Sequence, residues 1–359
     1  MPQNRNVKSY YNKEREIAVK YSIGYQVNTS NTFMEYIAEN KEHIYEMYFS
    51  WGDIPNGRNS MLMNRDLLPW QAQYKQIQDL DFISKQGIKL NLLLNGNCYG
   101  ENSQSRAFFT KIGETVDYIA QCFSLPSVTT TSPLIAKFLH ENFDGIEVRA
   151  SVNMKIGSVM GMEYVADYFD SFYMQREHNR DFSKIKELKG WCDKSGKGLF
   201  MLANSGCLSN CSAHTFHDNL VAHEADIAKM DNAYVFSGIC HEFLSHKENR
   251  ASVLKDMTFV RPEDMHLYEG YFVAAKLATR VSRNPIRTLR AYINGKYSGA
   301  ITDLLEPSHS GLFYPDIIEN SKLPEGFGKQ VANCKKNCEE CGYCKRAVEA
   351  ATVTLEDFE

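Results

Sequence analysis

Short apolar or alternating segments recur along the chain between longer amphipathic ones, a pattern that indicates a parallel sheet with helical crossovers. The segments predicted as strands are Ala18 to Gln26, His43 to Trp51, Ile88 to Asn95, Ser127 to Thr131, Gly145 to Val152, Asp170 to Gln175, Gly198 to Ala203 and Thr258 to Arg261. The segments predicted as helices are Asn31 to Asn40, Pro69 to Gln86, Ser105 to Gln121, Pro133 to Asn142, Ser158 to Tyr168, Phe182 to Ser195 and Ser212 to Met230. Eight strands that alternate with helices favour a closed α/β barrel of the TIM type, (β/α)8.

Turn residues support this alternation. Pro69 and Pro133 suit the first position of a helix, and Gly87 and Gly145 stand where a helix gives way to a strand. An open doubly wound sheet is the alternative architecture. The sequence contains no GxGxxG after the first strand and no GxxxxGK[ST], so the usual nucleotide-binding fingerprints of such sheets are missing.

The length of the chain leaves room for more than a barrel. Its 359 residues exceed the roughly 250 of a typical barrel. We therefore predict a barrel over residues 1–305 and a small Cys-rich extension over residues 306–359. The first residues, MPQNRNVKSYYNKERE, are polar and show no secretory signal, and no segment approaches the roughly 20 apolar residues that span a bilayer. These features predict a cytoplasmic protein that does not enter membranes.

Ten cysteines change the picture, because most of them are bunched. In a reducing compartment, bunched thiols indicate metal binding rather than disulfides. Cys207 and Cys211 follow the seventh predicted strand, and two sulfurs at this spacing can bind an iron–sulfur cluster. Cys98 and Cys240 are expected just past strands and would reach the same rim of the barrel.

Two alternatives to a cluster at this rim remain open. His214 and His217 could complete a zinc site with the two cysteines. A radical S-adenosylmethionine loop, CxxxCxxC, would need a cysteine where His214 stands, and it would follow the first strand instead of the seventh.

The C-terminal cysteines form a second candidate metal centre. They occupy one stretch of eleven residues and are Cys334, Cys338, Cys341 and Cys344. This compact spacing resembles a ferredoxin motif and favours a second cluster, with a small zinc knuckle as the alternative. Metal binding would hold together a segment that is rich in Lys, Asn and Glu and can bury little apolar surface.

Charge is unevenly distributed although the net charge is only −4. The stretch from Gly270 to Thr302 contains no acid but carries Lys276, Arg280 and further arginines at helical spacing, with Asn284-Pro285 as a cap and restart. We expect a helix that faces solvent or a partner. A surface for phosphate or RNA is the alternative interpretation.

Several motifs together resemble peptidase family U-32, the so-called collagenase-like peptidases, and their iron–sulfur relatives. The resemblance rests on NGNC after the third strand, EHNRD at 177–181, NSGCLSNCSAHTFHDN at 204–219, Cys240 and FVRPEDMHLYEG followed by KLATR. It implies a TIM-type barrel with a 4Fe-4S cluster held by Cys207, Cys211, Cys240 and, as the fourth ligand, Cys98. It also implies oxygen-independent hydroxylation of RNA or quinone precursors, with an electron entry point in the tail. The spacing CLSNC departs from the peptidase signature, which indicates a divergent branch.

We therefore expect an iron–sulfur redox enzyme that modifies an anionic small molecule or RNA, supplied by an electron donor protein. The predicted ligands of the anionic substrate or oxygen donor are Arg149, Asn153, Asn179, Arg180 and Arg261. The predicted acid–base residues are Glu177, His178 and His241. A cluster-bearing partner subunit without catalysis and a zinc-dependent peptidase or hydrolase are the alternatives. The sequence contains neither an HExxH nor a GxSxG motif, which counts against the peptidase or hydrolase interpretation.

Overall fold

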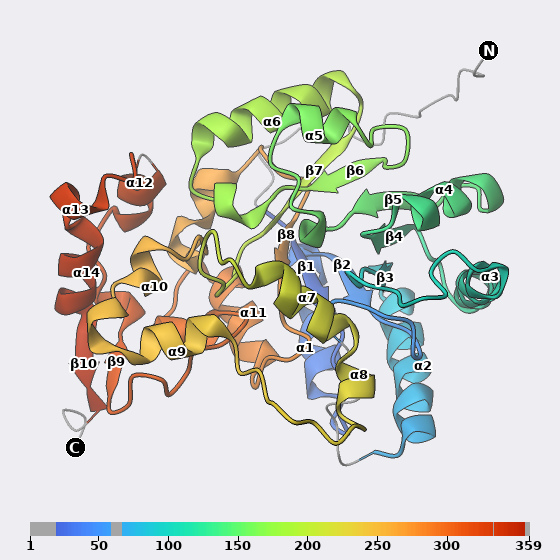
Figure 1. Cartoon of the computed structure of the whole chain (residues 1–359), viewed down its shortest axis with the longest axis horizontal. Helices are drawn as coiled ribbons and strands as arrows, with labels where there is room; N and C mark the ends of the chain where they lie inside the picture. Colours follow the sequence, from blue (N-terminus) through green and yellow to red (C-terminus); the bar gives the residue numbers. More distant parts are fainter. Residues whose placement is uncertain (1–18, 59–66, 333, 356–359) are drawn as a thin grey trace.

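The computed structural model describes residues 19–58, 67–332 and 334–355, and its central feature is a closed barrel of eight parallel strands (Figure 1). The strands are β1 (Tyr21–Gly24), β2 (Ile44–Phe49), β3 (Lys89–Leu94), β4 (Ser127–Thr130), β5 (Glu147–Ala150), β6 (Ser171–Tyr173), β7 (Gly198–Leu202) and β8 (Ala275–Leu277). Tyr21 of β1 pairs with Ala275 of β8 and closes the ring. The predicted TIM-type barrel is confirmed. Ala18 of the first predicted strand lies outside the described residues.

Helices surround the barrel and continue into the C-terminal region (Figure 1). The α-helices are α1 (Thr32–Glu39), α2 (Pro69–Lys85), α3 (Arg106–Cys122), α4 (Pro133–Asn142), α5 (Val159–Glu163), α6 (Phe182–Lys194), α7 (His214–Ala222), α8 (Glu224–Ile227), α9 (Ile239–Ser245), α10 (Ser252–Lys255), α11 (Pro285–Ile293), α12 (Phe327–Ala332), α13 (Cys338–Cys341) and α14 (Tyr343–Ala351). The short 3-10 helices are η1 (Lys41–His43), η3 (Val152–Met154), η4 (Arg176–His178), η5 (Lys247–Asn249), η6 (Pro262–Tyr268), η7 (Ile301–Leu304) and η8 (Asn320–Lys322).

Local sequence explains why these helices begin and end where they do. In α4, Pro133 occupies the first turn, and the Ser132 hydroxyl accepts a hydrogen bond from the Ile135 amide at 3.3 Å. This cap satisfies a backbone donor that the helix itself leaves unpaired. Gly87 and Gly145 both adopt φ of +80° between a helix and the next strand, a conformation that glycine reaches without steric strain.

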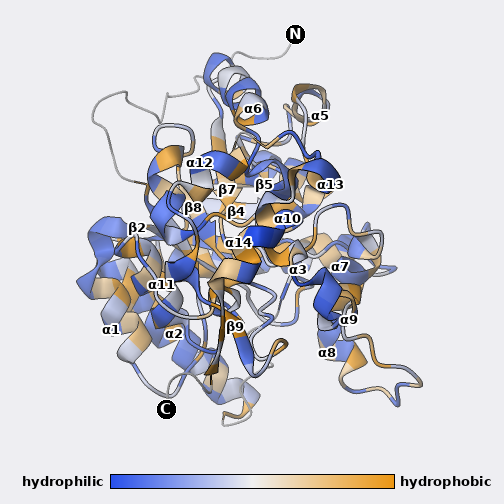
Figure 2. Cartoon of the chain, turned by 90° about the vertical axis from the view of Figure 1, so that its left-hand side faces the viewer, coloured by the Kyte–Doolittle hydropathy of each residue, from blue (hydrophilic) through white to orange (hydrophobic). Residues whose placement is uncertain are grey.

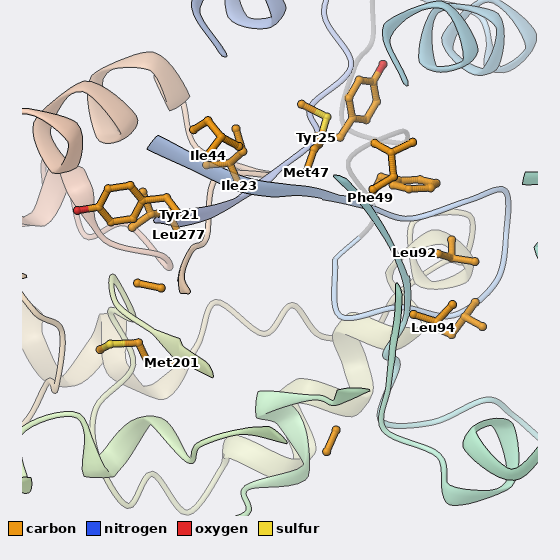
Figure 3. Packing of buried hydrophobic residues seen from close by; sticks show 14 of the residues in the cluster. Tyr21, Ile23, Tyr25, Ile44, Met47, Phe49, Leu92, Leu94, Met201 and Leu277 are labelled. Atoms are coloured by element: carbon orange, nitrogen blue, oxygen red, sulfur yellow. The ribbon is translucent and has the colours of Figure 1, made fainter. Parts of the chain in front are cut away.

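The strands separate an apolar outer layer from an interior where polar and aromatic side chains mix. Ile23, Met47 and Leu92 are fully buried and pack toward the surrounding helices (Figure 3). Hydrophobic residues run along the central strands, whereas outer helices such as α6 are more hydrophilic (Figure 2). Neighbouring positions along the same strands, such as Ser22 and Glu46, are also buried and hydrogen-bond to each other at 3.0 Å. Side chains alternate between the two faces of a strand, so these polar groups point into the barrel.

The eighth strand differs from the prediction. Thr258 to Arg261 has the alternating pattern of a strand, but it runs across the end of β7, where the Val260 amide donates to the Ala203 carbonyl at 2.8 Å. The barrel closes instead with Ala275–Leu277, a strand of only three residues with a lysine at its centre. This strand was hidden in the acid-free stretch that we expected to be a solvated helix.

Only part of the acid-free stretch is helical. The predicted cap is confirmed, because the Asn284 side chain accepts a hydrogen bond from the Arg287 amide at 2.9 Å and Pro285 opens α11. Two other predicted helices are shorter than expected. Ser158 to Tyr168 contains only α5, and Ser212 to Met230 is split between α7 and α8 by His223. Among the described residues, no helix is both long and apolar enough to cross a bilayer.

A second hydrophobic cluster lies beside the barrel. It includes Leu254 and Phe259 from the long connection between β7 and β8, together with Phe327 and Val348 near the C-terminus. The antiparallel pair β9 (Asp316–Ile318) and β10 (Thr352–Thr354) borders this region (Figure 1). Residues on both sides of position 305 therefore share one core. The domain boundary at 305/306 stays a prediction.

Candidate functional site at the barrel mouth

A cavity of about 110 Å³ opens at the carboxyl ends of the barrel strands, which is the end where barrels of this type carry their active sites. Tyr48, Leu202 and Lys276 line it from β2, β7 and β8, and helix α7 borders it from outside the barrel. The charged residues in its lining are Arg58, Arg176, Asp218, Lys276, Arg280 and Glu306, joined by His214 and His217.

Two buried guanidinium groups give the cavity a cationic wall. Arg176 donates to the Cys207 sulfur at 3.3 Å and to the Asn153 amide oxygen at 3.5 Å. Arg280 donates to the Asn56 amide oxygen at 2.9 Å. In the part of the chain that the structure describes, neither arginine has a carboxylate within ion-pair distance. Their charges are thus available to an anionic ligand.

Lys276 is a buried and strongly perturbed basic group of this cavity. It is only 7% exposed, and its amine lies 4.0 Å from the ring centre of Tyr48 and 5.4 Å from that of Tyr173. Burial, and secondarily the positive charge of Arg280, lowers the pKa of Lys276 to about 7. A substantial fraction of this amine is therefore uncharged near neutral pH.

Helix α7 adds a second titratable group to the mouth. The Nε2 atom of His214 lies 3.4 Å from a carboxylate oxygen of Asp218, which also accepts a hydrogen bond from the Asn97 amide at 3.3 Å. Burial lowers the pKa of His214 to about 3, assisted by the charge of Arg176. Burial also raises the pKa of Asp218. Neutral forms of both side chains are favoured by this desolvated setting.

The predicted cysteine ligands converge only in part. Burial raises the pKa of the Cys240 thiol, and the charges of Cys207 and Cys211 raise it further, which indicates that both of these sulfurs lie near that of Cys240. Cys240 belongs to α9 rather than to the end of a strand, so its predicted position is wrong. Cys98 follows β3 as expected and lines a neighbouring hollow with Asn97 and Asn153.

The four C-terminal cysteines surround a single cavity. Cys334, Cys338, Cys341 and Cys344 all line a space of about 440 Å³ between α10, α12 and α14. The Cys334 sulfur accepts a hydrogen bond from the Lys336 amide at 3.3 Å, and Lys336 adopts a left-handed φ of +60°. Burial raises the pKa of Cys344, and the other three cysteines contribute in the same direction. The tail set thus fits a multi-atom group bound by four thiolates.

A single metal ion is a different case. Within residues 19–58, 67–332 and 334–355, no three His, Cys, Asp or Glu side chains are grouped so that they could hold one ion. His214 and His217, the predicted partners of a zinc site, line the mouth cavity together with Cys207.

Arg149, a predicted substrate ligand, lies deep inside the barrel and is 1% exposed. One terminal nitrogen donates to both oxygens of Glu46 at 2.7 and 2.6 Å, and the other donates to Glu147 at 2.8 Å. Burial alone would lower its pKa, but the charges of Glu46 and Glu147 raise it well above the ordinary value. Its role in substrate binding stays a prediction, and the structure shows its terminal nitrogens paired with carboxylates.

Three other predicted substrate ligands support loops. Asn179 donates to the Leu202 carbonyl at 2.7 Å. Arg180 donates to the carbonyl oxygens of Leu254 and Phe259 at 2.7 to 3.1 Å, and Arg261 pairs with Asp264 at 2.7 Å. Of the predicted substrate ligands, Asn153 is the one that lines the mouth cavity.

The predicted acid–base residues lie on η4 and α9. Burial lowers the pKa of His178, while Glu177 has a buried carboxylate oxygen without a hydrogen-bond partner in the described residues. His241 follows Cys240 on α9. Their catalytic roles stay predictions.

Sequence reasoning missed the residues that give the cavity its charge. Lys276 and Arg280 were read as part of a solvated helix, and Arg58 and Glu306 were not singled out. The signal that could have identified Lys276 is its position between small and apolar residues, VAAKLAT, because a lone lysine in an apolar strand is buried against its preference.

Comparisons with known proteins identify the fold. No family model and no curated protein matches the sequence. The chain is similar to the U32 peptidase Mk0906, with a TM-score of 0.51 and 13% identity over 77% of this chain and 95% of that one. A GH113 β-1,4-mannanase matches with a TM-score of 0.34 and 8% identity over 60% of this chain and 85% of that one. A putative dehydratase from Zymomonas mobilis ZM4 matches with a TM-score of 0.33 and 14% identity over 59% of this chain and 54% of that one.

The likeness to Mk0906 shows a shared fold. Membership of this chain in the U-32 family, and in its iron–sulfur branch, stays a prediction from the motifs.

Proposed function

We propose that this protein is an iron–sulfur redox enzyme that modifies an anionic small molecule by an oxygen-independent, hydroxylation-like reaction, with RNA as the alternative substrate. The observation that carries the proposal is the cavity lined by all four tail cysteines. A cubane of four irons and four sulfides is larger than a single ion, so its thiolates stand further apart than those around zinc.

The tail has further features that suit a cluster. The amide of Lys336 donates to the Cys334 sulfur, and such hydrogen bonds tune the potential of iron–sulfur centres. Cys334 and Cys341 are exposed, which would let an electron donor protein approach the site. Arg180 is buried next to the tail, and its charge favours the thiolate of Cys344.

The mouth would carry the second cluster and the substrate. Cys207, Cys211 and Cys240 would be its ligands, with Cys98 from the neighbouring hollow as the predicted fourth. When bound, such clusters supply single-electron transfer, and an iron with an open position can activate an oxygen-bearing ligand. The chain itself contributes the cationic wall of Arg176 and Arg280, which would hold the anionic group beside these cysteines.

Metal analysis of the full chain purified without oxygen tests the proposal. We expect a brown protein with about eight irons and matching sulfide. Cys338→Ala should remove about half of the iron through loss of the tail set, and Cys240→Ala should remove the other half. Cys122→Ala changes an exposed cysteine at the end of α3 and should leave the iron content unchanged.

Three results would count against this function. They are stoichiometric zinc in place of iron, a metal-free protein after anaerobic purification, and an iron content that Cys338→Ala does not alter.

A further inference from the structure

The amine of Lys276 occupies an unusual place for a lysine. It projects from the centre of β8 into the barrel and lines the mouth cavity. Its neighbours are the ring faces of Tyr48 and Tyr173. Among the described residues, no carboxylate lies within ion-pair distance of this amine and no hydrogen bond holds it.

The nearest acid inside the barrel is already engaged. Glu46 accepts two hydrogen bonds from Arg149 and one from Ser22. The charged and titratable groups that act on Lys276 come from every neighbouring element and are Glu46 and Tyr48 of β2, Arg149 of β5, Tyr173 of β6, Arg176 of η4 and Arg280 after β8. Three of these six groups are cations and only Glu46 is an acid, so the site disfavours an ammonium ion and favours a neutral amine.

A neutral, desolvated lysine amine is a nucleophile toward carbonyl carbon. The same cavity holds Arg176 and Arg280, two guanidinium groups without a carboxylate partner in the described residues. It also holds Glu306 and Asp218, carboxyl groups whose pKa is raised by burial. The cavity therefore combines a nucleophile, an anion-binding wall and proton donors.

We propose that Lys276 forms a covalent imine with a small carbonyl compound that carries an anionic group. The amine nitrogen attacks the carbonyl carbon and forms a C–N bond as the C=O π bond opens. One proton then moves from the nitrogen to the former carbonyl oxygen, which gives a neutral carbinolamine with a hydroxyl group and a free nitrogen lone pair. A carboxyl group of the cavity, Glu306 or Asp218, then protonates this hydroxyl. The C–O bond breaks, water leaves, and the nitrogen lone pair forms the C=N bond of a protonated imine. No oxidant or reductant is needed.

The anionic group explains why the reaction would occur at this lysine. Arg176 and Arg280 would bind a carboxylate next to the carbonyl and hold the carbon within reach of the amine. This inference goes beyond the proposed iron–sulfur function and requires no cluster at either cysteine set. Its test does not depend on iron content, so the two proposals can fail separately.

Trapping with borohydride tests the imine. The full chain is incubated with pyruvate near neutral pH and reduced with sodium borohydride, and the lysine that carries the reduced adduct is identified by peptide mass spectrometry. We expect Lys276 to be labelled at least about tenfold more than any other lysine, because the neutral fraction of an ordinary lysine is far smaller at this pH. Acetone, which has the carbonyl but no anionic group, should label Lys276 at least about tenfold less than pyruvate.

Two matched variants sharpen the result. Lys276→Arg keeps a long basic side chain at this position but removes the nucleophilic amine, and it should abolish the adduct. Lys197→Arg changes a half-buried lysine. Burial lowers the pKa of this amine too, but it donates to the carbonyls of Ala166 and Phe169 outside the cavity. This variant should keep full labelling. Should Lys276→Arg fail to fold, the adduct map of the wild-type chain decides alone. Equal labelling of many lysines, or none at Lys276, overturns the proposal.

Discussion

The barrel interior contains two buried cations that meet opposite environments. Arg149 on β5 binds the carboxylates of Glu46 and Glu147, and its pKa is raised. Lys276 on β8 has aromatic faces and other cations around it, and its pKa is lowered to about 7. Both side chains are more than nine-tenths buried. Burial alone therefore does not decide their charge, and the partners do.

The two environments suit two roles for a buried cation: Arg149 stabilises the barrel, whereas Lys276 is available for chemistry. The two carboxylates fix Arg149 in one orientation, because both of its terminal nitrogens already donate hydrogen bonds to them. Lys276 has no carboxylate partner among the described residues, and it lines the mouth cavity. Perturbed cations that line cavities are candidates for chemistry, whereas fully paired ones hold a fold together.

The largest expected effect is the loss of the buried pair. Arg149→Met leaves Glu46 and Glu147 without their counter-charge inside the barrel, and removing one partner of a buried pair costs about 3–5 kcal/mol. The free energy of unfolding from urea denaturation at pH 7 measures this loss. We expect a markedly lower midpoint with an unchanged slope.

A charge-free variant is the matched control. Arg149→Met combined with Glu46→Gln and Glu147→Gln removes all three charges and should recover a large part of the lost stability. If the single and the triple variant are equally unstable, packing of the arginine side chain rather than its charge holds this part of the barrel.

The next effect concerns Lys276 and has the opposite sign. Its folded-state pKa lies below the unfolded value of 10.5, so the unfolded chain binds more protons between pH 7 and 10.5 and stability rises with pH in this window. Lys276→Met removes the buried amine and should stabilise the protein by roughly a few kcal/mol at pH 6. The gain should shrink steadily from pH 7 to pH 10.

Urea denaturation of wild type and variant at several pH values measures this difference. Lys229→Met changes an exposed lysine just after α8 and should show no comparable pH dependence. A gain from Lys276→Met that is the same at pH 6 and pH 10 would show that folding does not lower the pKa of the Lys276 amine.

The barrel could be predicted because the spacing of apolar residues and the positions of turn residues indicate the same strands and helices along most of the chain. Seven strands were placed correctly, and caps such as Ser132-Pro133 and Asn284-Pro285 were recognisable. The eighth strand escaped because three residues with a central lysine carry too little pattern, while TFVR carried a false one. This segment is a strand because it pairs with both β1 and β7. These partners are far away in the sequence, so the pattern of the segment itself does not reveal them.

The site was predictable only where chemistry is bunched in the sequence. The tail cysteines lie within eleven residues of one another in the sequence, and all four line one cavity. Substrate ligands were harder to predict, because a loop arginine such as Arg180 can bind either a ligand or a backbone carbonyl. The choice depends on which carbonyls remain unpaired after folding, and this is a property of the tertiary structure.

The smallest expected effect separates the ring of Tyr48 from its hydroxyl. The ring face lies 4.0 Å from the Lys276 amine, and the hydroxyl donates to the Leu277 carbonyl at 2.7 Å. The same hydroxyl accepts a longer hydrogen bond from the Thr279 amide at 3.4 Å. Tyr48→Phe keeps the ring and loses both hydrogen bonds, so it should cost about 1–2 kcal/mol of stability with the pKa of Lys276 unchanged. Tyr48→Leu also removes the ring, whose attraction favours the ammonium ion by about 1 kcal/mol. The pKa of Lys276 should then fall by somewhat less than about one unit. The pH dependence of amine modification at Lys276, followed by peptide mass spectrometry, measures this shift, and an equal shift in both variants would assign it to the hydroxyl instead of the ring.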